Sequence, residues 1–308
     1  MNFSTPQVQA PAAAPVISVK PVTLPAPGRG TDLQVRISAP ATGQDLPVIV
    51  FSHGYGSSMD GYGPLTDYWA AHGFVVVQPT YLDSRTLGVT PEDPRASQLW
   101  RFRIEDAKRV LDGLKVLEAA VPGLLGRVDR TRIAAAGHSF GGQTTGLLLG
   151  LRVQAPGGDD EDYTDARIRA GILFATAGVG GDALQPGMID KLPWLNPTFE
   201  HMRTPALVVA GDRDQSILTT RGPDWSEDPY HLSPGPKSLL RLKNAEHSLG
   251  GIPGYDAAET TDQNPAMVAL LQRLTLAYLR DSLDVDATSW PAAVAELADD
   301  SLGRIESK

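Results

Sequence analysis

The sequence predicts an α/β fold with a mostly parallel central sheet, and three observations support this class. Along the 308 residues, short apolar runs alternate with segments of helical periodicity, which is typical of parallel strands joined by helices. One run ends in a glycine-rich turn around a serine, and another ends in a turn with two aspartates. Because ligands bind at the carboxyl edge of such sheets, these turns are expected to lie at a functional site.

The expected strands are short runs of apolar residues that alternate or are fully buried, at residues 33–37, 46–51, 74–77, 133–136, 168–174, 206–210 and 238–242. The helix before the third strand is expected to end near residue 73. Two further helices are indicated by apolar residues spaced three or four apart, at Ile104, Ala107, Leu111 and Leu114, and at Met267, Leu271, Leu274 and Tyr278. These stripes are expected to face the core.

The chain length suits one large domain, with a flexible tail at residues 1–18 and a single domain at 19–308. The first fifteen residues are rich in Ala, Pro and Gln and lack the basic and apolar regions of an intact signal peptide. A cytoplasmic location is therefore expected, with a processed exported protein as the alternative. No run approaches the roughly 18 apolar residues of a transmembrane helix.

Charge and composition exclude several kinds of partner. The net charge of −9 argues against nucleic acid and anionic membranes, and the absence of cysteine excludes disulfides and thiolate metal sites. An acidic run at 157–162, followed by Asp165, resembles a calcium loop, but it lacks the sixth-position glycine and the closing glutamate. A solvated loop is predicted there, and neither a metal nor a cofactor is expected.

The sequence Gly137-His138-Ser139-Phe140-Gly141 follows an apolar run and precedes a helical segment. A strand, then Gly-x-Ser-x-Gly, then a helix is the pattern of a nucleophile elbow. The small residues allow a very tight turn, which exposes the serine oxygen, and the helix N-terminus favours negative charge beside it. Ser139 is therefore the candidate nucleophile.

A serine needs a base, and in elbow-type sites the acid and then the histidine follow it in the chain. His53 and His72 precede Ser139, and His138 lies within the elbow. Three histidines remain, namely His201, His231 and His247. Of these, His247 follows an expected strand, at the edge where ligands bind. His247 is therefore the predicted base, with His231 as the alternative.

The acid is expected after the strand at 206–210, where Gly211-Asp212-Arg213-Asp214 follows. Either aspartate could orient the histidine. Asp212 is nearer to the strand and could instead brace the turn by accepting backbone hydrogen bonds.

An oxyanion hole is expected from two backbone N–H groups. One belongs to Phe140, the residue after the serine, and the other to Tyr55, in the loop after the strand at 46–51. The four glycines at 54–63 could suggest a nucleotide loop, but the Gly-Lys-Ser/Thr ending and the Rossmann spacing are absent.

Together these motifs resemble the α/β-hydrolase superfamily over about residues 20–282, and its branch of dienelactone hydrolases, chlorophyllases and platelet-activating-factor acetylhydrolases. The resemblance implies an α/β-hydrolase fold and favours Asp214 as the acid, because superfamily members often use the last position of a Gly-x-x-Asp turn. Dienelactone hydrolases use a cysteine, which this chain lacks. The acetylhydrolases place their acid after the strand that follows the elbow, and no carboxylate follows the strand at 168–174.

The expected activity is cofactor-free hydrolysis of small carboxylic esters with short to medium acyl chains. Residues 178–204 could form a short lid, and Trp194 and Trp225 could line an apolar pocket. The alternatives are a perhydrolase or haloperoxidase, an acyltransferase with the same three residues, and a non-catalytic binding protein. The oligomeric state is not predicted.

Overall fold

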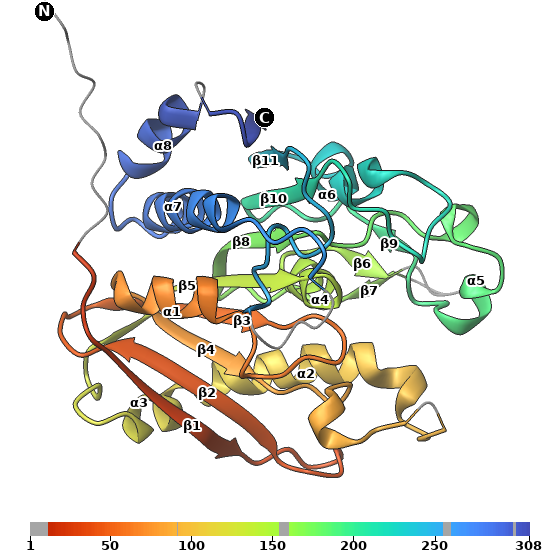
Figure 1. Ribbon diagram of the computed structural model, residues 1–308. Coiled ribbons are helices and arrows are strands. Elements are labelled where there is room, and N and C mark those ends of the chain that lie inside the picture. Colours follow the sequence, from red (N-terminus) through yellow and green to blue (C-terminus); the bar gives the residue numbers. More distant parts are fainter. Residues whose placement is uncertain (1–11, 91, 154–159, 255–259, 298–299) are drawn as a thin grey trace, which may run out of the picture.

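The computed structural model describes residues 12–90, 92–153, 160–254, 260–297 and 300–308. Its main feature is a nine-stranded sheet (Figure 1) with the order β1-β2-β4-β3-β5-β8-β10-β11-β12. The strands in that order are Val16–Leu24, Leu33–Pro40, Val75–Pro79, Leu46–Ser52, Val128–His138, Ile168–Phe174, Ala206–Gly211, Lys237–Leu242 and Gly303–Ser307. The seven strands expected from the sequence are all present, while β1 and β12 at the two edges were not assigned.

The six central strands, β4, β3, β5, β8, β10 and β11, pair in parallel with one another. The edges are antiparallel, with β1 on β2, β2 on β4, and β12 on β11. The parallel strands are almost fully buried, as expected for a sheet with helices on both faces. The predicted α/β-hydrolase type of architecture, with a mostly parallel sheet, is therefore confirmed.

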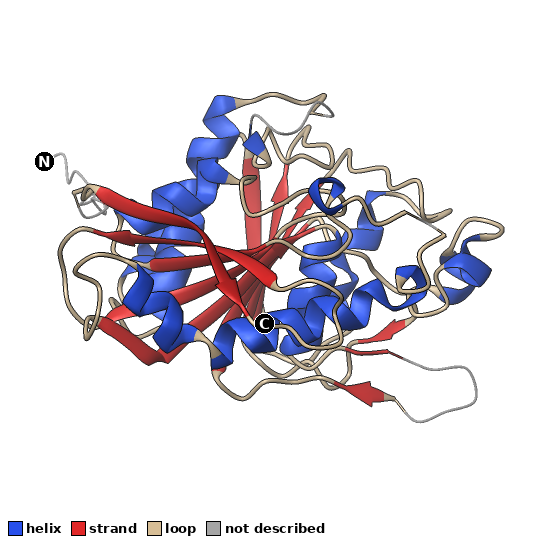
Figure 2. Ribbon diagram, turned by 90° about the horizontal axis from the view of Figure 1, so that it is seen from below, coloured by secondary structure: helices blue, strands red, loops and turns tan. Residues whose placement is uncertain are grey.

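Helices cover both faces of this sheet (Figure 2). On β3, Val48 and Val50 belong to one buried cluster, while Ile49 and Phe51 belong to the other, as the two-residue period of a strand requires. The first cluster includes residues of α2 (Leu99–Asp112), α3 (Leu114–Ala120) and α4 (Phe140–Leu148). The second includes residues of α1 (Gly63–Ala71), α7 (Pro265–Ser282) and α8 (Ser289–Leu297).

Two boundaries differ from the sequence prediction. Strand β1 begins at Val16, which pairs with Pro40, so residues predicted to belong to the tail are part of the sheet. The expected helical stripe at 104–114 spans two helices that meet at Gly113. A Cβ at Gly113 would lie 2.8 Å from the Leu24 side chain and 3.0 Å from the Arg109 carbonyl oxygen, so β1 packs closely on this break.

The acidic run lies partly outside the described residues, which exclude 154–159. Its remaining part forms strand β7 (Glu161–Asp162) in a small sheet with β6 (Arg152–Val153) and β9 (Pro197–Thr198). Glu161 pairs with Arg101, and Asp162 pairs with Arg152. Within the described ranges, no three His, Asp or Glu side chains cluster as a metal site would require, and no helix has the length and apolar character to cross a membrane.

Candidate active site

The predicted elbow is a sharp turn between β5 and α4. Ser139 separates the last residue of the strand from the first residue of the helix, with φ 56° and ψ −121°. These angles are unusual for a residue with a side chain and are found mainly at functional sites. The Ser139 N–H donates to the carbonyl of Phe174 at the end of β8, 2.9 Å away. The neighbouring strand therefore holds the strained turn in place.

Two glycines make this turn possible. A Cβ on Gly137 would lie 2.2 Å from the Gly141 carbonyl oxygen, and a Cβ on Gly141 would lie 2.0 Å from the Ser52 carbonyl oxygen. Both separations are far below van der Waals contact. The elbow therefore packs directly, main chain against main chain, on the end of β3.

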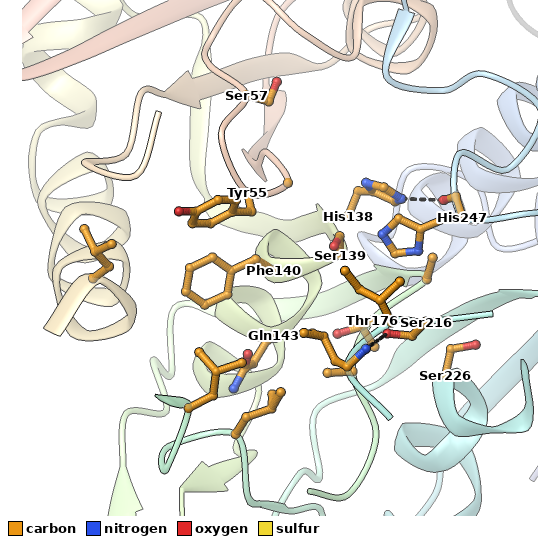
Figure 3. A pocket seen from close by; sticks show the side chains of 18 of the residues that line it. Tyr55, Ser57, His138, Ser139, Phe140, Gln143, Thr176, Ser216, Ser226 and His247 are labelled. Atoms are coloured by element: carbon orange, nitrogen blue, oxygen red, sulfur yellow. Dashed lines mark hydrogen bonds between the residues drawn. The ribbon is translucent and has the colours of Figure 1, made fainter. Parts of the chain in front are cut away.

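His247 and Asp214 are brought together by the loops that follow β11 and β10. The His247 Nδ1 lies 3.0 Å and 3.1 Å from the two carboxylate oxygens of Asp214. The Asp214 side chain is only 4% exposed, while that of His247 is 49% exposed. Ser139 and His247 line the same cavity, as Figure 3 shows. A buried carboxylate therefore holds an accessible imidazole next to the elbow.

Asp212 has a different environment. Its Oδ1 accepts a hydrogen bond from the Asn244 N–H, 2.6 Å away, and its own N–H donates to the Leu242 carbonyl. Asn244 has φ 60° and therefore sits in a tight turn. Asp212 thus braces the turn before His247. The other candidate base, His231, bonds to Glu227 at 3.2 Å and does not line the cavity.

The two backbone groups expected to form an oxyanion hole lie in the same cavity wall. Tyr55 and Phe140 both line the cavity, with ring centroids 6.4 Å apart. Among the described residues, neither the Tyr55 N–H nor the Phe140 N–H has a hydrogen-bond partner. Both donors are therefore available to a bound molecule.

The loop that carries Tyr55, here called the β3 loop (residues 53–56), is held by buried polar groups. The Arg103 guanidinium forms two hydrogen bonds with Asp83, at 2.7 Å and 2.6 Å, and donates to the His53 carbonyl at 2.8 Å and the Gly54 carbonyl at 3.3 Å. Asp83 also accepts from the Gly56 N–H. Both charged side chains are fully buried. Hydrogen bonds on both sides of Tyr55 therefore fix the loop.

His53 completes this arrangement as a neutral imidazole. Its Nδ1 donates to the Gly54 carbonyl, 2.7 Å away, and its Nε2 accepts from the Tyr81 N–H, 3.0 Å away. Burial and the nearby Arg103 lower the pKa of His53 to about 4. Burial raises the pKa of Asp83, but Arg103 outweighs it, so that this pKa lies below its usual value. The site thus contains a buried ion pair and a neutral histidine.

The cavity above these groups has a volume of about 1040 Å³ and is lined mainly by apolar side chains. Residues 178–204, here called the cap segment, contribute Lys191, Leu192, Trp194 and Leu195 to it. The Trp194 ring stacks on Phe140 at 5.1 Å and on Trp100 at 6.2 Å. This segment, predicted as a lid, contains the short helix α5 (Met188–Lys191) and β9.

Trp225 also lines the cavity, but it is only 4% exposed. Its indole N–H donates to the Val179 carbonyl at 2.7 Å. Trp225 packs with Leu184 and Leu195 in a small cluster separate from the two main cores. It therefore supports the cap segment and presents only a small surface to the cavity.

Comparisons with known proteins agree with this geometry. The family model described as Chlorophyllase matches residues 16–155, which contain the β3 loop and the elbow. The chain has an α/β-hydrolase fold and is similar to the chlorophyllase family over these residues.

Curated relatives are about equally similar to this chain. It is 28% identical to Cutinase 2 of Thermobifida cellulosilytica over 208 residues, covering 67% of the chain and 62% of the relative. It is 28% identical to Cutinase cut1 of Thermobifida fusca, over 67% of the chain and 50% of the relative. Platelet-activating factor acetylhydrolase of Cavia porcellus is 28% identical over 80% of the chain and 59% of the relative. The chain spans 50% to 62% of the length of these relatives. The expected resemblance to the chlorophyllase and acetylhydrolase branch is confirmed.

Several residues of the candidate site are not among those predicted from the sequence. Arg103 and Asp83 form a buried ion pair although they lie 20 residues apart, and no short-range pattern in the sequence indicates it. Gln143 lines the cavity one helical turn after Ser139, is 2% exposed, and its Nε2 has no hydrogen-bond partner in the described residues. Its spacing of four residues from Ser139 on a helix was the signal that could have identified it.

Proposed function

We propose that this α/β-hydrolase is a serine esterase that cleaves carboxylic esters through an acyl-enzyme. The observation that carries the proposal is the convergence of Ser139, on its strained turn, with the His247–Asp214 pair in one cavity. Nucleophile, base and orienting acid occur in the chain order typical of elbow-type hydrolases. The names of the relatives, cutinase and acetylhydrolase, support ester cleavage.

In the proposed reaction the Ser139 oxygen attacks the ester carbonyl while His247 accepts the serine proton. Asp214 accepts a hydrogen bond from Nδ1, which selects the imidazole tautomer with a free Nε2 and stabilises the imidazolium formed during attack. The imidazolium then protonates the leaving alcohol. A water molecule, activated by the same base, releases the acid and regenerates Ser139.

The negative charge of the tetrahedral intermediate would be stabilised by the N–H groups of Tyr55 and Phe140. Deleting one such donor typically costs about 3 kcal/mol of transition-state stabilisation. The N-terminus of α4 adds a favourable dipole at the same position. Because the β3 loop is held on both sides of Tyr55, the donors need little reorganisation when charge develops.

The proposed substrates are small esters with short to medium acyl chains. The apolar lining and the stacked Trp194 and Phe140 suit an acyl or alcohol group without charge. No cofactor takes part in the proposed reaction. The cytoplasmic location stays a prediction, with a processed exported protein as the alternative.

The test is covalent labelling with a fluorophosphonate combined with a kinetic panel. The wild-type protein should be labelled at Ser139, and Ser139→Ala should lose both the label and at least about 1,000-fold of kcat. Ser57→Ala, which removes another serine of the cavity wall, should keep the label. A Ser139→Ala variant with more than about a tenth of wild-type kcat contradicts the assignment, since loss of the nucleophile costs several powers of ten.

p-Nitrophenyl esters from acetyl to palmitoyl would define the acyl preference. Assays with added hydrogen peroxide or alcohol would separate hydrolysis from perhydrolysis and acyl transfer, because these reactions share the acyl-enzyme and differ only in the second nucleophile. A protein that is never labelled at Ser139 and cleaves no ester would instead be a binding protein.

A further inference from the structure

His138 and Tyr62 form a buried hydrogen-bonded chain between two loops of the proposed active site. The His138 Nε2 lies 2.7 Å from the carbonyl oxygen of His247, as the dashed line in Figure 3 shows. The His138 Nδ1 lies 2.9 Å from the Tyr62 hydroxyl, and that hydroxyl lies 3.0 Å from the Gly54 nitrogen. His138 is 4% exposed and Tyr62 is 2% exposed. The chain therefore runs from the His247 loop, through the elbow, to the β3 loop.

The direction of each hydrogen bond follows from the groups involved. A carbonyl can only accept, so the His138 Nε2 carries a proton and donates to His247. In a neutral imidazole Nδ1 is then an acceptor, and the Tyr62 hydroxyl donates to it. The same hydroxyl oxygen accepts from the Gly54 N–H. Burial and the nearby His247 lower the pKa of His138 to about 3, so the neutral form is maintained.

The Gly54 end of this chain meets the groups that hold the β3 loop. The peptide between His53 and Gly54 is bound at its carbonyl by Arg103 and at its N–H by Tyr62. A peptide group is planar, so bonds at both ends fix its orientation. The next peptide carries the Tyr55 N–H, and its carbonyl oxygen accepts from His53. Tyr62 therefore helps to fix the direction of the proposed oxyanion donor.

The other end of the chain holds the segment of the proposed base. The His138 ring packs against the His247 ring, with centroids 4.8 Å apart. The backbone N–H of Tyr62 also donates to the carbonyl of Pro253, 3.0 Å away in the same loop. The elbow and the start of α1 thus contact the His247 loop through main chain and side chain.

We propose that His138 and Tyr62 are positioning residues that keep the base loop and the oxyanion donor at fixed distances from Ser139. The inference rests on the proposed serine esterase function. Neither side chain is assigned a chemical step, and both act through backbone groups of other residues. If the two side chains only packed in the core, their rings would be sufficient. The positioning role requires in addition the Tyr62 hydroxyl and both ring nitrogens of His138.

Tyr62→Phe and His138→Phe test this distinction, because each keeps an aromatic ring and removes the polar contacts. In each variant kcat for a p-nitrophenyl ester should fall roughly 10- to 100-fold with KM changed less than about threefold, as expected when reacting groups are misplaced. The double variant should lose little more than the worse single variant, because either change breaks the same chain.

Conservative variants should recover part of the loss. His138→Asn keeps an acceptor near Nδ1 for the Tyr62 hydroxyl, and His138→Gln keeps a donor that can extend toward the His247 carbonyl. We expect both to be faster than His138→Phe, provided that their thermal midpoints show folded protein. Tyr278→Phe serves as the matched control, because Tyr278 is a buried tyrosine on α7, packed on Trp290 and away from the cavity. Its kcat should match the wild type.

Ser139→Ala, measured in parallel, separates the two proposals. If it loses activity while folded Tyr62→Phe and His138→Phe keep wild-type kcat, the positioning role is wrong and the esterase proposal stands. If all variants, including Tyr278→Phe, lose kcat in proportion to the decrease in their thermal midpoints, the hydrogen bonds of His138 and Tyr62 contribute only to stability. If Ser139→Ala stays active, the proposed function fails and the positioning role fails with it.

Discussion

The two walls of the cavity are built in different ways. The wall around the elbow and the β3 loop is held by buried hydrogen bonds and an ion pair, which bind backbone groups at defined angles. In the wall formed by the cap segment and the loop after Asp214, Leu184, Leu195 and Trp225 pack in an apolar cluster. Hydrogen bonds, such as those of Arg221 with Asp228 and of Trp225 with the Val179 carbonyl, join the segments of this wall to each other. Several of its side chains reach into solvent, among them Ile217, which is 84% exposed.

This difference separates two requirements of the proposed esterase. Attack and charge stabilisation depend on directions, which hydrogen bonds impose and apolar contacts do not. Substrate selection depends on size and shape, which apolar contacts can provide while tolerating substitution. The wall around the elbow and the β3 loop is here called the polar wall, and the wall formed by the cap segment and the loop after Asp214 is called the apolar wall. We therefore expect changes in the polar wall to reduce kcat, and changes in the apolar wall to alter the KM values of different substrates.

The largest effect within the polar wall is expected at Asp214. Asp214→Asn should lower kcat by about 10,000-fold with little change in KM, because the amide favours the wrong imidazole tautomer. Asp212→Asn should leave kcat near the wild-type value and lower the free energy of unfolding by about 1 kcal/mol, because its oxygen braces the turn at Asn244. Steady-state kinetics and denaturant unfolding of both variants measure these effects. Loss of turnover in a folded Asp212→Asn variant would reverse the assignment.

A second comparison uses two buried arginines. Arg103 pairs with Asp83 and holds the β3 loop, while Arg29 pairs with Asp106 and binds the Thr80 carbonyl. Both pairs are fully buried. Replacing either arginine by lysine should lower the free energy of unfolding by roughly 1–3 kcal/mol, because lysine cannot reproduce the forked hydrogen bonds.

Only Arg103→Lys should also lower kcat, by at least about tenfold, because it alone disturbs the loop of the oxyanion donor. Arg29→Lys, measured in the same ester assay, is the control for destabilisation. Equal kcat in the two folded variants would mean that the polar wall does not depend on Arg103.

The polar wall should also determine part of the acid sensitivity of the fold. The pKa values of His53 and His138 are lowered to about 4 and about 3, whereas an unfolded histidine titrates near 6.5. Between these values the unfolded chain binds more protons than the folded one, so stability falls as the pH decreases below about 6.5. Between neutral pH and pH 5, protonation of each of these histidines in the unfolded chain should lower the free energy of unfolding by about 2 kcal/mol.

Denaturant unfolding at pH 7.5 and pH 5 measures this effect. In His138→Phe the difference between the two pH values should be smaller than in the wild type by about 2 kcal/mol. Tyr278→Phe, which keeps both buried histidines, should retain the wild-type difference. An unchanged difference in His138→Phe would show that His138 does not stay neutral in the folded protein.

The smallest change in turnover is expected from the apolar wall. Trp194→Ala removes the ring that stacks on Phe140. We expect kcat for an acetyl ester to stay within about threefold, while KM for a longer acyl chain rises by about tenfold, equivalent to about 1.4 kcal/mol of lost contact. Ile217→Ser changes an exposed residue of the same wall and should have a smaller effect. A large loss of kcat with the acetyl ester would contradict the separation of the two walls.

The sequence was most informative where the chemistry is local. The elbow spacing, the strand before it and the order of Asp214 and His247 after it are short-range patterns, and the structure has these residues in one cavity. The core stripe on α2 was also predicted correctly, since Ile104, Ala107 and Leu111 are buried.

The polar wall could not be predicted in the same way, because its partners are far apart in the chain. Arg103 lies beside an apolar stripe, and its partner Asp83 is 20 residues earlier. His53 and His138 were set aside as bases by chain order, which says nothing about hydrogen bonds to backbone groups. Two edge strands were also missed, because β1 alternates weakly and β12 is only five residues long.

The main-chain contact between Gly141 and Ser52 has a consequence for how such a protein can be altered. With no side chain between them, the spacing of the elbow and the β3 loop does not depend on which residues fill the cavity. Libraries that vary the cap segment can therefore explore new specificities without retuning the attack geometry. Any side chain introduced at Gly141 would separate the two segments, so this glycine is a position to exclude from mutagenesis.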